Sequence, residues 1–474
     1  MSCCYLWVIL KILLIFLLLT NVSGQSKYEE RRAMGKFLLF TDFHIDDQYD
    51  RHGDPSKMCH RNATNGTDQQ TTRASSPGPF GSRTCDPPLA LIDFMLKEAQ
   101  KKLPDPDYII WTGDNAAHDK YDESRLLSTL ESANSAILQH FPGIIVVPVV
   151  GNHESVPGND FADDEGNNNY AGIFERWKDW IGESAKKTFL RGGYYLFRSP
   201  LDNSVFIILN TNFYYVGNKE VKRNNSFAHI IAHIPIGAYE MYSVKNEDWK
   251  PEMSGRYNRR LYDIFVAYSP WIRWMLFGHL HTDTFRILKA PDGTPVQRMF
   301  LNPAVTPLFN LNNPAFRIFE YNPKNMDIDD VKTFYVELET LNENGAEMTE
   351  AKLEYSHREA YGIDGPLSAK TLNELLERMK QNETIFDQYF NYSSVQWMTR
   401  KLNETERASH LCVLEYVDYD QLEQCIRHNQ KNNITLLYVS ILAVVVLAVG
   451  IGLVAVFLIC CYSRKNVGKI RFFC

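Results

Sequence analysis

Five short apolar runs in this chain each end in side chains of the types that bind metal ions. The runs span residues 36–40, 108–111, 144–150, 230–232 and 274–277. The side chains that follow them are, in chain order, Asp42, His44, Asp114, Asn152, His153, His233, His279 and His281. In an open α/β sheet, the loops beyond the carboxyl ends of the strands converge on one crevice. We therefore expect these side chains, although distant in sequence, to meet in one site.

Apolar residues between these runs recur at helical spacing, which predicts an α/β architecture. Leu89, Ile92 and Leu96 lie on one face of a predicted helix, and residues 126–137 form a second helix of the same period. Further strands are predicted at 205–209, 298–301, 316–321 and 331–338. Together these elements predict a large α/β domain at 36–340.

The pattern changes again toward the C-terminal end. Four apolar residues recur there at helical spacing, namely Leu372, Leu375, Leu376 and Met379. We interpret residues 341–430 as a small helical subdomain that caps the larger domain.

Both ends of the chain are apolar and predict export and membrane attachment. Residues 12–19 form an apolar run before small residues near Gly24, which is typical of a signal peptide at 1–24. Lys11 interrupts the longer apolar stretch, so an uncleaved anchor is the alternative. Residues 434–462 carry no charge and are long enough to form a transmembrane helix. The cations that follow predict a cytosolic tail at 463–474, whereas a removable lipid-anchor signal would lack them.

This topology predicts a single-pass type I protein of the plasma membrane with its body outside the cell, or an endolysosomal protein as the alternative. Four of the nine cysteines lie in the expected external part, and their proximity favours pairing Cys59 with Cys85 and Cys412 with Cys425. Glycosylation sequons are present at Asn62, Asn65, Asn224, Asn382, Asn391 and Asn403. A seventh, Asn433, abuts the predicted span, so we do not expect its modification.

The net negative charge of the chain limits the kinds of molecule that it can bind. The formal net charge is −7, and five of the cations lie in the two terminal segments, so the body is more acidic still. A surface of that sign repels polyanions, which argues against duplex nucleic acid as a partner.

The strand-end residues make a donor set that is too large for one metal ion. It contains two carboxylates, one amide oxygen and four imidazoles besides His153. Such a set suits two ions with Asp114 between them, an arrangement used to align a hydroxide for in-line attack at phosphorus. An imidazole-rich site outside the cell favours zinc. A single histidine beside an apolar strand is usually structural and Gly-Asp is a common turn, so the inference depends on the succession of five motifs.

The residues of these motifs and their order along the chain resemble those of the calcineurin-like metallophosphoesterases. Within that group, they are most similar to the acid sphingomyelinase-like phosphodiesterases. The resemblance covers residues 36 to 425 and rests on TDFHIDDQY, PGPFGSRTCD, WTGDNAAHD, GNHE, LNTNFYY, IIAHIPIG, FGHLHTD and PAVTP. It implies a metallophosphoesterase-type four-layer αββα sandwich with two zinc ions. One implied ligand set is Asp42, His44, Asp114 and His281. The other implied set is Asp114, Asn152, His233 and His279.

The resemblance also implies a reaction and the catalytic residues. A hydroxide between the two metals attacks phosphorus, and His118 or His153 protonates the leaving oxygen. The alternative is that His118 is an ordinary exposed loop residue without a catalytic role. We expect an extracellular phosphodiesterase, acting as a monomer, that hydrolyses phosphodiester or pyrophosphate bonds of nucleotides or phospho-head-group substrates. The alternatives are a sphingomyelin phosphodiesterase acting on membrane lipid and a membrane-anchored pseudoenzyme that binds phosphorylated ligands.

Two departures from the family pattern bear on these expectations. Acid sphingomyelinase carries a six-cysteine lipid-extracting module before the matching region, and few residues separate Gly24 from Asp42 here, which favours soluble nucleotides over bilayer lipid. The family also places a helix between LNTN and IIAH, whereas residues 213–229 are polar and not helix-periodic. A covering helix is therefore expected to be missing, either natively or through an altered transcript.

Overall fold

The computed structural model describes most of the expected external part of the chain. The described residues are 34–61, 77–159, 161, 169–201, 204–214, 229–242, 249–309, 312–397, 400–429, 446–447 and 449–458. The predicted signal peptide 1–24, the tail 463–474 and the sequons Asn62, Asn65 and Asn224 lie outside these ranges. Most of the predicted span 434–462 and of the connection 213–229 also lies outside them.

The first of two six-stranded sheets is mixed and contains the three strands that carry the first ligand motifs. Its strands are β1 (Gly35–Phe40), β2 (Tyr108–Trp111), β3 (Ile145–Pro148), β10 (Ala315–Tyr321), β11 (Ile328–Tyr335) and β12 (Lys352–Ser356), in the order β12-β11-β10-β1-β2-β3. Strands β1, β2 and β3 are parallel, so their carboxyl ends lie at the same edge. Strands β10, β11 and β12 extend the sheet in antiparallel fashion.

The second sheet carries the remaining ligand motifs. Its strands are β4 (Tyr195–Arg198), β5 (Val205–Leu209), β6 (His229–Ala232), β7 (Met275–Phe277), β8 (Thr284–Lys289) and β9 (Pro295–Leu301), in the order β4-β5-β6-β7-β9-β8. Strands β5, β6, β7 and β9 are parallel, and β4 and β8 are antiparallel edge strands. The carboxyl ends of β6 and β7 therefore lie together as well.

The two sheets face each other across an aromatic core. Trp274, which precedes β7, is fully buried, and its ring centroid lies 4.8 Å from that of Phe37 on β1 and 4.9 Å from that of Tyr321 on β10. The rings of Phe300 on β9 and Phe319 on β10 meet edge to face at 5.7 Å. Large aromatic side chains on both inner faces exclude water between the sheets and fix their spacing.

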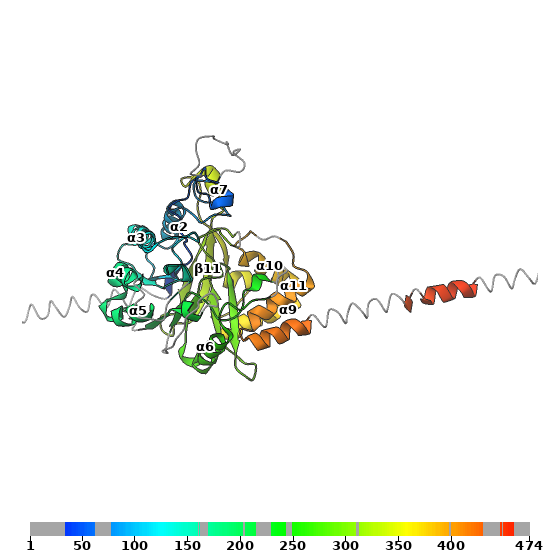
Figure 1. Cartoon of the computed structure of the whole chain (residues 1–474). Coiled ribbons are helices and arrows are strands. Elements are labelled where there is room, and N and C mark those ends of the chain that lie inside the picture. The colour runs from blue at the N-terminus through cyan, green and yellow to red at the C-terminus, as the bar shows by residue number, and fades with distance from the viewer. Residues whose placement is uncertain are drawn as a thin grey trace, which may run out of the picture.

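Helices cover the outer faces, as Figure 1 shows. The α-helices are α2 (Leu89–Lys102), α3 (Glu123–His140), α4 (Asn169–Ile181), α5 (Lys186–Gly192), α6 (Gly255–Ala267), α7 (Leu338–Asn344), α8 (His357–Tyr361), α9 (Ala369–Gln381), α10 (Glu383–Ser393) and α11 (Glu404–Glu415). Short 3-10 turns are η1 (Pro55–Lys57), η2 (Asn152–Glu154), η3 (Glu183–Ala185), η4 (Thr211–Tyr214), η5 (Glu240–Tyr242) and η6 (Ser269–Trp271). Helices α2 and α4 pack on the first sheet, and α6, α9 and α11 pack on the second. The expected C-terminal helical region is thus confirmed.

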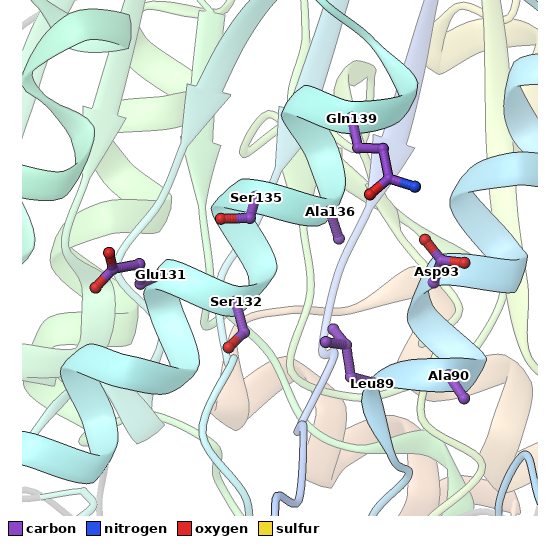
Figure 2. A pocket seen from close by; sticks show the side chains of 8 residues that line it. All are labelled: Leu89, Ala90, Asp93, Glu131, Ser132, Ser135, Ala136 and Gln139. Carbon is purple, nitrogen blue, oxygen red and sulfur yellow. The ribbon is translucent and has the colours of Figure 1, made fainter.

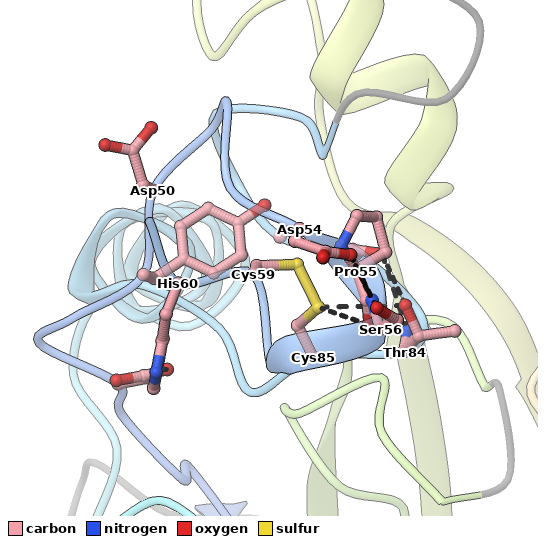
Figure 3. Close-up of a disulfide and its surroundings, with 12 residues drawn as sticks. Asp50, Asp54, Pro55, Ser56, Cys59, His60, Thr84 and Cys85 are labelled. Atoms are coloured by element: carbon pink, nitrogen blue, oxygen red, sulfur yellow. Dashed lines mark hydrogen bonds and ion pairs between the residues drawn. A yellow bond between two sulfur atoms is a disulfide. The ribbon is translucent and has the colours of Figure 1, made fainter. Parts of the chain in front are cut away.

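The structure contains both expected disulfides. Cys59 and Cys85 are bridged with their Cα atoms 5.8 Å apart, beside the η1 turn (Figure 3). Cys412 on α11 is bridged to Cys425, which lies in a further helical segment at 419–429. The first bridge closes a loop in the connection between β1 and α2, and the second ties the segment 419–429 to α11.

Three sequons lie within the described part of the chain. Asn382 and Asn403 are exposed, and each side chain caps a helix through its oxygen, which leaves the amide nitrogen free of that bond. Asn391 differs because its Nδ2 donates to Gln396 Oε1 at 2.9 Å. Glycosylation of Asn391 would leave one N–H on Nδ2, so only the other hydrogen could make this bond.

Residues 446–447 and 449–458 are helical and exposed. Across the ranges that the structure describes, no helix combines the length and the apolar character needed to cross a bilayer.

We predict that the contact between the sheets at Trp274 is a principal source of stability. Trp274→Ala removes a fully buried ring and an indole N–H that donates to the carbonyl of Met326 at 2.6 Å. The free energy of unfolding should fall by about 3–5 kcal/mol in chemical denaturation. Leu196→Ala, on an exposed side of β4, is the matched control and should change it by less than about 0.5 kcal/mol. Equal losses in the two variants would contradict this account of the core.

Candidate functional site

The loops that follow the carboxyl ends of strands in both sheets bring the predicted ligands to one place. Backbone hydrogen bonds join the loops within each sheet: the N–H of Asp42 donates to the Gly113 carbonyl at 2.9 Å, and that of Gly278 donates to the His233 carbonyl at 3.1 Å. A further bond joins the loop after β9 to the first sheet, because Thr306 N–H donates to the Asp42 carbonyl at 3.1 Å. The ligand loops are therefore fixed to each other as well as to their strands.

Most of these residues have an unusual backbone conformation. Five of them lie in the left-handed region, namely Asp42 (φ 53°), His44 (φ 44°), Asp114 (φ 59°), His279 (φ 71°) and His281 (φ 56°). For a residue with a Cβ this conformation costs roughly 1–3 kcal/mol and persists only where the surroundings enforce it. Strain of this kind is concentrated at functional sites, and here it turns each side chain inward directly after its strand.

Glycines permit the close approach of the loops. A Cβ on Gly151 would lie 2.2 Å from Asp114 Oδ1, and a Cβ on Gly278 would lie 2.2 Å from Thr41 Oγ1 and 2.9 Å from Asp42 Oδ2. The glycines that precede Asn152 and His279 are therefore required by space, since any side chain there would displace the acidic groups.

One cluster of possible metal-binding groups is formed by Asp42, His44 and His281. His281 Nε2 lies 3.1 Å from Asp42 Oδ1, and His44 Nε2 lies 3.9 Å from the same oxygen. His44 Nε2 is also 3.5 Å from Asp114 Oδ2. All of these groups are buried.

A second cluster is formed by Asp114, His233 and His279. His233 Nε2 lies 3.1 Å from Asp114 Oδ2 and 2.8 Å from Asn152 Oδ1. His279 Nδ1 lies 2.9 Å from Asn152 Oδ1. Asp114 Oδ2 thus lies near imidazoles of both clusters, as expected for a residue shared between two sites.

Hydrogen bonds on the far side of each imidazole orient its other nitrogen. The Nδ1 atoms of His44, His233 and His281 lie 2.9, 2.8 and 3.2 Å from the carbonyls of Ala116, Thr112 and Leu308. A ring that donates through Nδ1 presents the lone pair of Nε2 to the site, which is the usual arrangement of a metal-ligating histidine. His279 is reversed, because its Nε2 lies 3.4 Å from Glu252 Oε2 and its Nδ1 faces the site.

The electrostatics of the cluster fit a cation. Among the described residues, Asp42 Oδ1 and His44 Nε2 are buried without a hydrogen-bond partner. Burial opposes protonation of His233, but the carboxylates of Asp114 and Asp42 outweigh it and raise its pKa to about 9. Burial works against ionisation of Asp114, yet the nearby histidines, His233 first, hold its pKa well below the usual value. The donor set therefore attracts positive charge and is suited to divalent metal ions.

His118 and His153 lie beside the first cluster. The rings of His44 and His118 stack with centroids 4.0 Å apart, and the ring of His153 lies 4.5 Å from that of His118. Burial lowers the pKa of His153 to about 4, although Asp114 opposes this, so His153 is neutral near neutral pH. The His118 side chain is 17% exposed and so reaches the solvent-facing side of the site.

Asp86 holds His118 and was not found from the sequence. This buried carboxylate accepts the backbone N–H of His118 at 2.6 Å, and its Oδ1 lies 2.9 Å from His118 Nδ1. The pair fixes the ring with Nε2 directed away from Asp86. Asp86 directly follows the disulfide-bonded Cys85. Its place after a cysteine in the PGPFGSRTCD motif is the one signal that could have singled it out.

Glu154 is a second residue that sequence reasoning missed. Its two oxygens accept the backbone N–H groups of Gly151, Asp114 and Asn115 at 2.6, 3.0 and 2.8 Å. Burial and the neighbouring charge of Asp114 raise its pKa to about 7. Glu154 therefore joins the turns after β2 and β3. The acidic residue of the GNHE motif thus accepts hydrogen bonds from backbone N–H groups in this structure.

A separate groove of about 450 Å³ lies between α2 and α3 (Figure 2). It is lined by Leu89, Ala90, Asp93, Glu131, Ser132, Ser135, Ala136 and Gln139. None of the predicted site residues borders it.

Comparisons with known proteins agree with this geometry. The family model of the calcineurin-like phosphoesterases matches residues 35–283, and that of the acid sphingomyelin phosphodiesterase C-terminal region matches residues 294–432. The chain is 30% identical over 434 residues to the human acid sphingomyelinase-like phosphodiesterase 3b, covering 84% of this chain and 91% of the relative. It is 29% identical over 430 residues to the human cyclic GMP-AMP phosphodiesterase SMPDL3A, covering 83% and 90%. It is 28% identical over 458 residues to sphingomyelinase phosphodiesterase C of Dictyostelium discoideum, covering 88% and 98%.

The first family model spans more than half of the chain, and the human 3b relative is matched along most of its length. The chain therefore belongs to the acid sphingomyelinase-like phosphodiesterases, hydrolases of the calcineurin-like metallophosphoesterase superfamily.

Proposed function

We propose that this chain is an extracellular dinuclear-metal phosphodiesterase that hydrolyses phosphodiester or pyrophosphate bonds of nucleotides or phospho-head-group substrates. The observation that carries the proposal is the sharing of Asp114 Oδ2, which lies 3.5 Å from His44 Nε2 in one cluster and 3.1 Å from His233 Nε2 in the other. One carboxylate between two imidazole-rich sets is the donor arrangement of a two-metal hydrolytic site.

The two clusters support the following ligand sets. One ion would be held by Asp42, His44, Asp114 and His281. The other would be held by Asp114, Asn152, His233 and His279. The imidazole content favours zinc. When bound, the ions supply Lewis acidity that activates water for in-line attack and neutralises charge on the phosphate oxygens.

The chain's own residues would then handle protons and orientation. His118 is the better candidate for the group that protonates the leaving oxygen, because it is partly exposed and is held by the buried carboxylate of Asp86. His153 is neutral near neutral pH, so it suits hydrogen bonding to the phosphate better than proton donation. The backbone N–H of His153 donates to Asp114 Oδ1 at 2.8 Å, and this bond ties His153 to the shared carboxylate.

The cellular location and the substrate class of this chain are supported by different observations. Two disulfides and exposed sequons at Asn382 and Asn403 favour an oxidising compartment, and we propose an external or endolysosomal body attached by the span 434–462. The domain bounds 36–340 and 341–430 and the monomeric state also remain proposals. Relatives named for cyclic GMP-AMP match most of the chain, which favours a nucleotide substrate.

Asp114→Asn tests the shared ligand. The substitution keeps the shape of the side chain and removes the charge that both ions would share. Phosphodiesterase activity should fall at least about a hundredfold, and bound zinc, measured by elemental analysis after loading, should fall below the wild-type value. Asp263→Asn on the exposed face of α6 is the control and should retain both. A loaded wild-type chain that holds about one ion or fewer would rule out the dinuclear site.

Asp86→Asn tests the orientation of His118. We expect kcat to fall about a hundredfold, the lower end of the usual contribution of a positioned proton donor, with a smaller effect on KM. His118→Ala should have a similar effect, and the double variant should be little worse than either single one, because both changes disable one group. Multiplicative losses in this cycle would show that Asp86 acts independently of His118.

A further inference from the structure

An exposed aromatic side chain lies directly against the site and has no role in the proposed reaction. The ring centroid of Phe309 is 4.6 Å from that of His118 and 5.4 Å from that of His281, in both cases edge to face. The residue is nevertheless 57% exposed. A single exposed apolar residue is ordinary on a surface, but this one lies between the candidate proton donor and a candidate metal ligand.

The backbone holds Phe309 there at some cost. Its φ of 76° is left-handed, which is unfavourable for a bulky residue. The preceding segment is fixed to the ligand loops: the Leu308 carbonyl lies 3.2 Å from His281 Nδ1, and Thr306 N–H donates to the Asp42 carbonyl. The strained turn therefore begins at residues anchored to the site and directs the ring to its mouth.

Core packing does not account for the position of Phe309. The residue is absent from the apolar clusters formed by the described side chains, and the ring contacts given above are with imidazoles. Backbone strain, exposure and contact with the site together suggest a surface kept for a ligand.

The surroundings favour one kind of ligand group. A ring face can stack on a planar base or hold a quaternary ammonium ion. One neighbour of Phe309, His281, belongs to a cluster that would hold a metal cation, so a trimethylammonium group there would meet positive charge. A neutral, planar base meets no such repulsion.

We propose that Phe309 determines specificity by stacking against the nucleobase of a nucleotide substrate, an inference that rests on the proposed function. Phe309 takes no part in bond cleavage. Its ring contributes to binding of the base, so its removal should leave the rate of the chemical step unchanged.

The test compares ligands that differ only in the base. Binding of cytidine 5′-monophosphate, ribose 5-phosphate and phosphocholine to the zinc-loaded full chain in detergent is measured by calorimetry. Hydrolysis is measured with cytidine diphosphoethanolamine and its abasic analogue. Phe309→Ala should raise Kd and KM for the cytidine compounds roughly 5- to 150-fold, the equivalent of about 1–3 kcal/mol of stacking at 1.4 kcal/mol per tenfold. The kcat and the constants for the abasic compounds should stay unchanged.

Matched variants separate stacking from bulk and from folding. Phe309→Trp should retain cytidine binding, and Phe309→Leu, which keeps apolar bulk, should lose most of the preference for the base. Leu353→Ala, at an exposed position on β12, should behave as wild type. If Phe309→Ala fails to fold, the comparison of the Leu and Trp variants decides the question.

Two failures are distinguishable. Unchanged cytidine binding in Phe309→Ala, or a selective loss of phosphocholine binding instead, would overturn the stacking proposal while wild-type hydrolysis leaves the proposed function intact. A zinc-loaded wild type that cleaves no phosphodiester would overturn the proposed function, and the calorimetric comparison would still decide whether the ring binds a base.

Discussion

The buried carboxylate of Asp114 is the constraint on which the site depends. It is 2% exposed, and an ionised carboxylate is stable at such depth only if it is paired and hydrogen-bonded. One oxygen accepts the His153 N–H, and the other faces His233 and His44. The surrounding imidazoles, and the cations that they are suited to bind, follow from the need to neutralise this charge.

Holding that arrangement requires strained turns, and the sheets supply the rigidity. Parallel strands fix where each turn begins, and Glu154 fixes the backbone of two turns through three N–H groups. Gly151 and Gly278 remove the side chains that would keep the turns apart. The cost of the left-handed residues is therefore offset by packing that lies outside the site.

The C-terminal region contributes to the site through the chain after His281. Thr282 donates to the buried Glu240, which pairs with Arg286. Asp283 pairs with Arg317 on β10, and its N–H donates to the carbonyl of Ser393 at the end of α10. The loop that carries two candidate ligands is thus held by strands and helices from both family-model regions, which explains why the two regions form one structure.

The sequence by itself determined the candidate ligand types, their position after buried strands and the cysteines that pair, because apolar period and strand ends are local properties. It did not reveal β8, whose apolar run contains Arg286, since a charge hides a buried strand until its partner Glu240 is known. Asp86, Glu154 and Phe309 were missed for a related reason. Each acts through a contact with a residue distant in the chain or through a backbone angle, and no spacing rule encodes either. Tertiary structure alone decided which nitrogen of each histidine faces the site and which aromatic ring lies against it, because packing between the two sheets sets those distances.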